Sequence, residues 1–356
     1  MDTRSLQLIE VQEFQTPTGV DYKFHMNQET KKILLRDNNK GTLVCPVAIC
    51  GKFRCGKSFL ANLLLGQMNG FKVDPSSNAC TKGIWIWPTP APSANGHSQK
   101  MDTFILDCEG SQSTSRAATS ALDSKLISLV LLISSALVWN SSGMIDKPTI
   151  DALASVLKLT TDMVRRNKSS SINLPANFPA LYWVLRDFSL NLDTETPTNY
   201  LHRKLLSSNP SIATFLLKNL PHTKCFTLPL PISSEPLLQD LPHLPYTQLR
   251  PAFQSSFKAL QASLQKSAPK KWSSHALDMK AFLSLTETIL NLLNEDDIPV
   301  LKNSVEQIFA YKVREVSDLT FKRFCTEFLG KIELPLDPEA LFEKFIGGQM
   351  EFLREY

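Results

Sequence analysis

A chain of 356 residues with 43% hydrophobic residues can bury a large core, as one large domain or as two. Its net charge of +4 is small and its basic residues form short, scattered pairs, which argues against a nucleic-acid-binding surface. Seven cysteines without a C-x-x-C spacing argue against a structural zinc site and for free thiols in a reducing compartment.

Three stretches bear on targeting. Residues 1–13 are acidic and polar where a secretory signal needs an apolar block. The most apolar stretch, residues 126–139, is short for a bilayer span and contains three serines, so we expect it to be buried structure. Residues 352–356 do not form a prenylation box. We therefore expect a soluble, cytoplasmic protein.

The N-terminal region predicts a mixture of short elements. Residues 9–14 form a short segment that is followed by a polar turn at 16–19. Residues 27–35 fit a helix. The apolar run at 43–50 is long enough for one buried strand of a parallel sheet.

The segment between this strand and a helix predicted at 59–65 reads G-x-x-x-x-G-K-S, the pattern of a phosphate-binding loop. Gly51 and Gly56 allow the backbone to turn so that successive N–H groups point at an anion. Lys57 supplies a positive charge for the β- and γ-phosphates, and Ser58 supplies a hydroxyl for Mg²⁺. The sequence therefore predicts a nucleotide site that uses Mg²⁺.

A second motif follows about fifty residues later. Residues 70–81 are expected to form a polar loop, and a strand is predicted at 82–87. Another buried strand at 103–107 ends on Asp107, and Gly110 follows three residues later. In nucleotide-binding sheets this pattern places a carboxylate near Mg²⁺ and a backbone N–H near the γ-phosphate.

The middle of the chain alternates between helices and strands. An apolar helix-to-strand region covers 122–140, an amphipathic helix covers 150–159, and strands are predicted at 180–185 and 224–228. This alternation predicts an α/β fold with a doubly wound, mostly parallel sheet whose ligands bind at the carboxyl ends of the strands.

The composition changes in the last third of the chain. Seven prolines between residues 221 and 251 predict a rigid loop instead of regular structure. Beyond it the pattern becomes helical, with helices expected at 249–264, at 276–293, from Pro299 onward and at 337–352.

Three further motifs join the phosphate loop: T-K-G-I-W-I-W at 81–87, L-D-C-E-G at 106–110 and V-L-R-D-F at 184–188, supported by segments 134–141 and 298–305. Together they resemble the guanylate-binding protein branch of the dynamin-like GTPases, whose relatives include the atlastins. The resemblance implies a large P-loop GTPase domain at 1–296, followed by the start of an α-helical middle domain at 297–356.

The resemblance also implies residue roles. Thr81 would close over Mg²⁺ and the γ-phosphate, and Glu109 would lie near the attacking water. Arg54 would act in cis as an arginine finger, because a planar guanidinium suits the charge on a transferring phosphoryl group. The implied metal ligands are Ser58, Thr81 and Asp107, and the implied GTP- or GDP-binding set is Gly51, Lys52, Phe53, Arg54, Cys55, Gly56, Lys57, Ser58, Phe59, Asp107, Gly110, Arg186 and Asp187.

The choice of guanine also depends on the resemblance. The N-K-x-D tetrad of small GTPases is absent, since Asn167-Lys168 is followed by two serines. The family instead uses an Arg-Asp pair at the end of a strand, which corresponds to Arg186 and Asp187. The Asp187 carboxylate would accept hydrogen bonds from guanine N1–H and the exocyclic amine, which weakens the alternative of an ATP-dependent kinase.

Two departures from the family pattern leave the rate of hydrolysis open. Ala79 stands where relatives commonly have a serine, and residues 111–120 lack the family's acidic character. One hypothesis is a GTPase that forms homodimers through its nucleotide face, and the alternative is a GTP-binding interaction module with little turnover. Membrane or vesicle association would come through partners or the helical region. Cys55 is either a redox-sensitive thiol or a small filler, and we expect the latter.

Overall fold

The computed structural model describes residues 4–16, 19–37, 41–52, 55–73, 83–91, 101–108, 119–166, 174–272, 275–294, 326 and 337. The chain divides into two compact units, Met1–Leu301 and Lys302–Tyr356. The helices and strands given below all belong to the first unit. The helices expected after Pro299 and at 337–352 lie outside the described residues, and the boundary between residues 296 and 297 stays a prediction.

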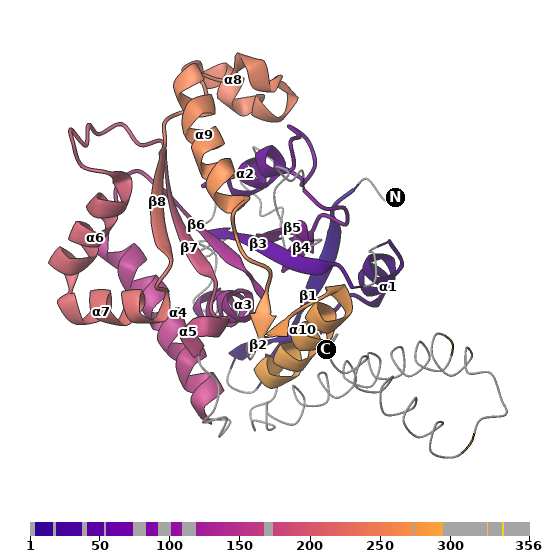
Figure 1. The fold of residues 1–356 in the computed structure, drawn as a ribbon. Helices are drawn as coiled ribbons and strands as arrows, with labels where there is room; N and C mark the ends of the chain where they lie inside the picture. Colours follow the sequence, from indigo (N-terminus) through magenta and orange to yellow (C-terminus); the bar gives the residue numbers. More distant parts are fainter. Residues whose placement is uncertain are drawn as a thin grey trace. The chain divides into compact units, whose positions relative to one another are not determined.

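The first unit is built on one twisted sheet (Figure 1). Its parallel part consists of β3 (Leu43–Gly51), β5 (Met101–Cys108), β6 (Ala136–Ser142), β7 (Ala180–Arg186) and β8 (Thr223–Leu228). The antiparallel part consists of β1 (Leu6–Thr16), β2 (Gly19–Met26) and β4 (Ile84–Ile86). The eight strands lie in the order β2-β1-β4-β5-β3-β6-β7-β8, which confirms the predicted mostly parallel α/β fold.

Helices cover both faces of the parallel strands. On one face, α2 (Lys57–Leu64) and α9 (Pro251–Leu264) share a hydrophobic cluster with β3. On the other face, α3 (Thr119–Ile133) and α10 (Met279–Asn294) pack against β3, and α4 (Lys147–Arg166) packs against α3. Because both faces are covered, β3 is buried from Val44 to Gly51 and reads as one continuous apolar run.

Two helices next to β8 were not predicted. These are α6 (Pro197–Ser208) and α7 (Pro210–Asn219), and α6 packs against both β8 and α7 (Figure 1). Their starts carry recognisable signals, since the side chains of Thr196 and Asn209 cap them and a proline follows each cap. The short helix α5 (Leu174–Asn177) precedes β7.

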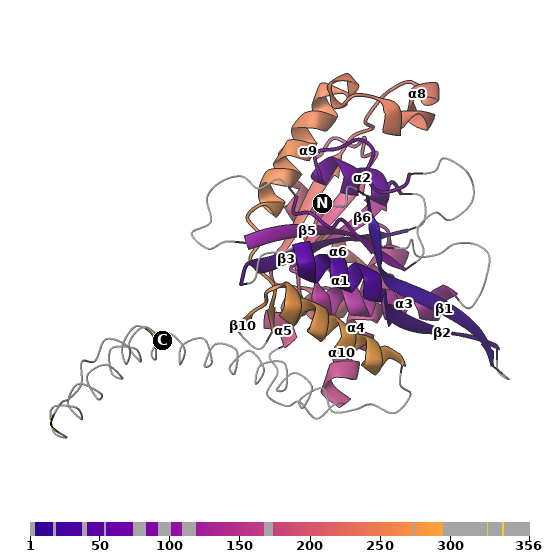
Figure 2. The same ribbon diagram turned by 90° about the vertical axis from the view of Figure 1, so that its right-hand side faces the viewer.

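The N-terminal region forms more strand than predicted. The expected segment at 9–14 is part of β1, which pairs with the unpredicted β2 in a long antiparallel hairpin (Figure 2). The helix expected at 27–35 is α1 (Gln28–Asp37). The Asn294 side chain at the end of α10 accepts from Phe24 N–H at 2.8 Å and donates to Phe24 C=O at 2.7 Å, which ties the hairpin to the body of the unit.

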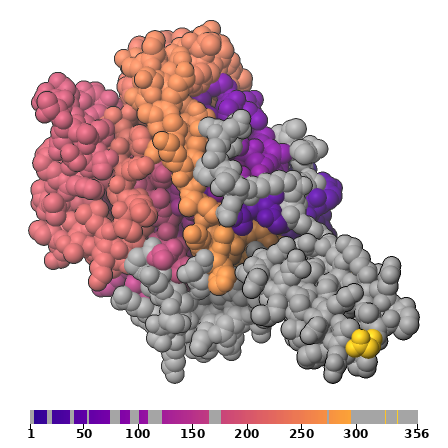
Figure 3. Space-filling model, in the orientation of Figure 1, coloured from indigo at the N-terminus to yellow at the C-terminus, as the bar shows by residue number. Residues whose placement is uncertain are grey.

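The strand predicted at 224–228 is β8. The interpretation of residues 221–251 as a rigid loop is wrong for the rest of this region, which contains the helix α8 (Glu235–Gln239) and the 3-10 helices Leu241–His243 and Tyr246–Gln248. Pro236 and Pro242 stand in the first turns of their helices, where no N–H donor is needed. The segment then continues through α9 toward the two-stranded β9 (Lys271–Trp272) and β10 (His275–Ala276), as an orange band across the face shown in Figure 3.

The most apolar stretch of the sequence forms the end of α3 and the start of β6 and is buried, as predicted. In the part of the chain that the structure describes, no helix has the length and apolar character that crossing a bilayer would require.

Candidate functional site

The two glycines of the predicted phosphate loop have conformations that other residues rarely adopt. Gly51 ends β3 with a φ of 149°, and a Cβ there would lie 1.9 Å from the backbone oxygen of Asn140. Gly56 is the N-cap of α2 with a φ of 76°. The first glycine therefore lets β3 and β6 approach closely, and the second lets the backbone turn into the helix.

Lys57 begins α2, and its side chain lies back along the loop. It is only 7% exposed, and its Nζ donates to the backbone oxygen of Lys52 at 3.0 Å. A lysine cation thus spans the loop from the inside, as a phosphate cradle requires.

The next residue of α2 contacts the end of β5. Ser58 Oγ donates to Asp107 Oδ2 at 2.6 Å, and Asp107 is only 1% exposed. The two residues come from motifs that are 49 positions apart, and the parallel pairing of β3 with β5 brings them together. A hydroxyl and a carboxylate are oxygen ligands of the kind that Mg²⁺ prefers, so these residues fit that metal.

Asn140, at the carboxyl end of β6, supports the loop and was not among the predicted site residues. Its side chain is buried, and Nδ2 donates to the backbone oxygen of Cys55 at 2.7 Å. The change from apolar to polar residues toward the end of β6 was the sequence signal that could have identified Asn140.

The environment of Cys55 is that of a structural thiol. Its Sγ donates to the backbone oxygen of Lys52 at 2.9 Å. Burial raises the pKa of this thiol above its usual value, although the nearby Lys57 charge opposes the shift. A high pKa disfavours the reactive thiolate, which supports the small-filler interpretation.

Arg186, at the end of β7, lies beneath the loop. It is 5% exposed, and its Nη1 donates to the backbone oxygen of Gly56 at 3.2 Å. The guanidinium carbon lies 5.8 Å from the ring centre of Phe59 and 5.9 Å from that of Phe253. Burial lowers the pKa of this guanidinium, and the neighbouring Asp187 charge raises it. The direct contact of Arg186 is therefore with the loop backbone.

Asp187 follows β7 and is exposed, with a φ of 55°. A non-glycine residue in the left-handed region costs about 1–3 kcal/mol, and such strained residues cluster at functional sites. Lys52, another predicted site residue, forms a half-exposed ion pair with Asp146 at 3.4 Å. Phe59 is buried in the core.

Several predicted site residues lie outside the described residues: Phe53, Arg54, Thr81, Glu109 and Gly110. The same holds for Ala79 and for most of segment 111–120, whose last two residues begin α3. The roles of all these residues stay predictions.

Comparison with known proteins identifies the family that this chain resembles. The family model "Guanylate-binding protein, N-terminal domain" matches residues 21–271. Guanylate-binding protein 5 of Homo sapiens is 31% identical over 336 residues, covering 88% of this chain and 55% of the relative. Guanylate-binding protein 5 of Mus musculus is 32% identical over 313 residues, covering 78% of this chain and 50% of the relative. The chain therefore spans about half the length of these curated relatives.

Among solved structures, Roco2 RocCORdC of Methanosarcina barkeri bound to GDP covers 77% of this chain at 14% identity. The match covers 68% of that structure's chain, with a TM-score of 0.36. The family model, in contrast, covers most of the first unit, including the strands that carry Asp107, Asn140 and Arg186. On that match, the chain belongs to the guanylate-binding protein family.

Proposed function

We propose that this chain binds GTP and hydrolyses it to GDP. The observation that carries the proposal is the 2.6 Å contact between Ser58 Oγ and Asp107 Oδ2 next to the buried Lys57. A hydroxyl, a carboxylate and a cation meet there at the carboxyl edge of a parallel sheet, where α/β proteins bind ligands. Membership of the guanylate-binding protein family supports guanine as the base.

The residues of the site would each have a defined role toward the nucleotide. The Lys57 ammonium would exchange the Lys52 carbonyl for β- and γ-phosphate oxygens. Ser58 and Asp107 would hold Mg²⁺, the carboxylate through water. When bound, the metal would neutralise charge on the phosphates. Arg186 would keep the Gly56 backbone in place, and Asp187 would accept hydrogen bonds from guanine.

Hydrolysis would use residues that the family resemblance assigns. Arg54 would place its guanidinium on the γ-phosphate in cis, and Glu109 would lie near the attacking water. Thr81 would close over Mg²⁺ and the γ-phosphate, and the Gly110 N–H would meet the γ-phosphate. We further propose that two copies dock through their nucleotide faces and help to close this site. Ala79 removes a hydroxyl that relatives commonly have, so turnover is expected to be slow.

Nucleotide titration of the purified chain tests binding. Fluorescent GTP and GDP should bind in the presence of Mg²⁺, and unlabelled ATP should compete weakly. Lys57→Ala should abolish tight binding, because the loop loses its only inward-facing cation among the described residues. Lys258→Ala, which changes an exposed lysine of α9, should bind like the parent. Equal GTP affinity of the parent and Lys57→Ala would refute the site.

Single-turnover assays at several protein concentrations test catalysis. The rate per molecule should rise with concentration, and Arg54→Ala should lower it by about 10³–10⁵ with little change in GTP affinity. Arg203→Ala removes an exposed arginine that pairs with Glu195 on the surface and should not change the rate. A rate that is independent of both concentration and Arg54 would instead favour the GTP-binding interaction module.

A further inference from the structure

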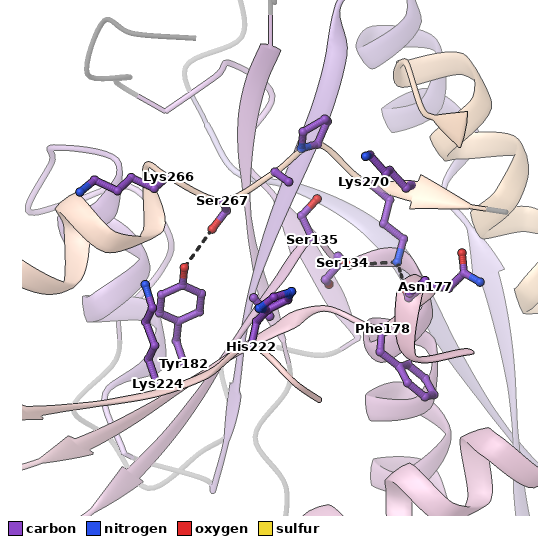
Figure 4. Close-up of a pocket in the computed structure, with 15 residues that line it drawn as sticks. Ser134, Ser135, Asn177, Phe178, Tyr182, His222, Lys224, Lys266, Ser267 and Lys270 are labelled. Carbon is purple, nitrogen blue, oxygen red and sulfur yellow. Dashed lines mark hydrogen bonds between the residues drawn. The ribbon is translucent and has the colours of Figure 1, made fainter. Parts of the chain in front are cut away.

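A cavity of about 410 Å³ opens at the amino-terminal edge of the parallel strands (Figure 4). Ser134 and Ser135, just before β6, line it together with His222 and Lys224 at the start of β8. The connection from α9 to β9, residues 266–271, forms the other wall. The phosphate loop lies at the opposite ends of these strands, about 20 Å away for a seven-residue strand. The cavity is therefore separate from the nucleotide site.

The lining of this cavity is strongly cationic. No aspartate or glutamate belongs to it among the described residues, whereas it includes His222, Lys224, Lys266, Lys270 and Lys271. Lys224, Lys266 and Lys271 are exposed around the rim. Three exposed ammonium groups with no carboxylate among the described lining residues give this face a positive potential, which would attract an anion.

The floor of the cavity holds a buried cation. Lys270 is 2% exposed, and its Nζ donates to the backbone oxygens of Ser134 at 3.0 Å and Asn177 at 2.6 Å (Figure 4). Burial lowers the pKa of Lys270 to about 7. A bound anion would favour the charged form of this lysine.

Hydroxyl groups lie beside the cations. Ser134 Oγ is buried and has no hydrogen-bond partner within the described part of the chain. Ser267 Oγ and the Tyr182 hydroxyl lie 3.3 Å apart on the opposite wall, and the Tyr182 hydroxyl also donates to the backbone oxygen of Ser263 at 3.1 Å. The serine hydroxyls of the lining are donors that an anion could accept from.

We propose that this cavity binds a small molecule that carries phosphate groups. Lysine binds phosphate as a point charge, and several ammonium groups around one opening suit a ligand with more than one negative charge, which phosphate groups supply. The volume lies within the range of metabolite pockets. Phe178, Ala180 and Tyr182 provide apolar wall for a carbon skeleton. The proposal does not depend on GTP binding, because it uses none of the residues of the phosphate loop.

Calorimetric titration of the full chain tests this site, with inorganic phosphate, pyrophosphate and inositol trisphosphate as probes and saturating GDP present. We expect the affinity to increase with the number of phosphates. The double substitution Lys266→Gln/Lys271→Gln should weaken binding of the trisphosphate about tenfold or more. The control Lys218→Gln/Lys258→Gln removes the same charge from exposed positions of α7 and α9 outside the cavity lining and should bind like the parent.

Vesicles distinguish the sources of the phosphate group. Flotation with phosphatidylcholine vesicles that contain phosphatidylinositol bisphosphate tests a lipid headgroup, with phosphatidylserine vesicles of equal charge as the reference. Binding of the soluble trisphosphate alone supports a free sugar phosphate, and binding of both supports a headgroup. Three results would overturn the proposal: no probe binds, both double variants lose binding equally, or vesicles bind while the soluble probes do not.

Discussion

Gly51 and Gly143 both have positive φ angles, but only Gly51 is enclosed by its neighbours. A Cβ at Gly51 would lie 1.9 Å from the Asn140 backbone oxygen, whereas a Cβ at Gly143 would have nothing within 4 Å. Strand β3 can therefore approach β6 at this point only with glycine.

Gly51→Ala should lower the free energy of unfolding by more than about 3 kcal/mol, because the clash adds to the backbone strain. Gly143→Ala introduces only the backbone strain of a positive φ and should lower the free energy of unfolding by about 1–2 kcal/mol. Urea unfolding of the two variants checks the difference. Equal losses would show that the close approach of β3 and β6 contributes nothing to stability.

Asp187 and Asp193 form a second matched pair, with φ angles of 55° and 49° and both side chains exposed. Asparagine tolerates the left-handed conformation, so Asp→Asn should preserve the fold at each position. Only Asp187 follows β7, at the carboxyl edge of the sheet.

Asp187→Asn should therefore reduce the preference for GTP over ATP, because the amide brings a donor against the donors of guanine, at a cost of about 1–3 kcal/mol. Asp193→Asn should leave the ratio of the two affinities unchanged. Displacement of a bound fluorescent nucleotide by GTP and by ATP measures this ratio. An unchanged ratio in Asp187→Asn would remove this residue from base recognition.

At the scale of elements, α9 connects the hydrophobic core to the phosphate loop. Phe253 of α9 is buried, its ring centre lies 6.3 Å from that of Phe59 on α2, and it also contacts the Arg186 guanidinium. Arg186 in turn donates to the Gly56 backbone. A helix from the last third of the first unit thus helps to position a loop encoded some 200 residues earlier.

Phe253→Leu should lower the free energy of unfolding by about 1–2 kcal/mol through lost packing and ring contacts. It should also weaken GTP binding, because Arg186 loses one of its two aromatic neighbours. Phe282→Leu makes the same change at a buried position of α10, on the other face of the sheet, and should destabilise the fold without weakening GTP binding. Equal GTP affinities of the two variants would contradict the connection through α9.

At the scale of the whole first unit, Lys270 links three distant segments. It follows α9, its backbone N–H donates to Val44 of β3, and its ammonium bonds the segments that contain Ser134 and Asn177. Its pKa of about 7 lies below the value of 10.5 for an unperturbed lysine, because burial disfavours the charge.

This depressed pKa predicts how stability depends on pH. Between about pH 7 and 10.5 the unfolded chain holds a proton on Lys270 that the folded chain has released, so stability rises with pH across that window. Below about pH 7 the lysine is charged in both states and contributes no slope.

The parent should gain about 1 kcal/mol of unfolding free energy relative to Lys270→Met between about pH 7.5 and 8.5. Taking the difference cancels the groups that both proteins share, including the other basic side chains of the cavity, which are His222, Lys224, Lys266 and Lys271. Urea unfolding at each pH measures it, and parallel pH profiles of the two proteins would contradict the prediction.

The sequence by itself determined the features that depend on neighbouring residues. The phosphate-loop pattern, the apolar strands that flank it and the Asp107 that ends another strand are local patterns, and they predicted the α/β fold. Local patterns failed at the hairpin strand β2, at α6 and α7, and at the helices within residues 235–248. Strand β2 forms because it pairs with β1. The helices within residues 235–248 form despite their prolines, because Pro236 and Pro242 stand in first helical turns.

Only the tertiary structure decided how distant segments meet. It placed Asn140 under the loop, Arg186 between Phe59 and Phe253, and a cationic cavity at the opposite edge of the sheet. The sequence can mark one of these residues, as the polar end of β6 marks Asn140, but it does not mark the contact, because each contact joins residues from different strands and helices. Their burial and charge depend on the strand order, and that order is set by packing across the whole sheet.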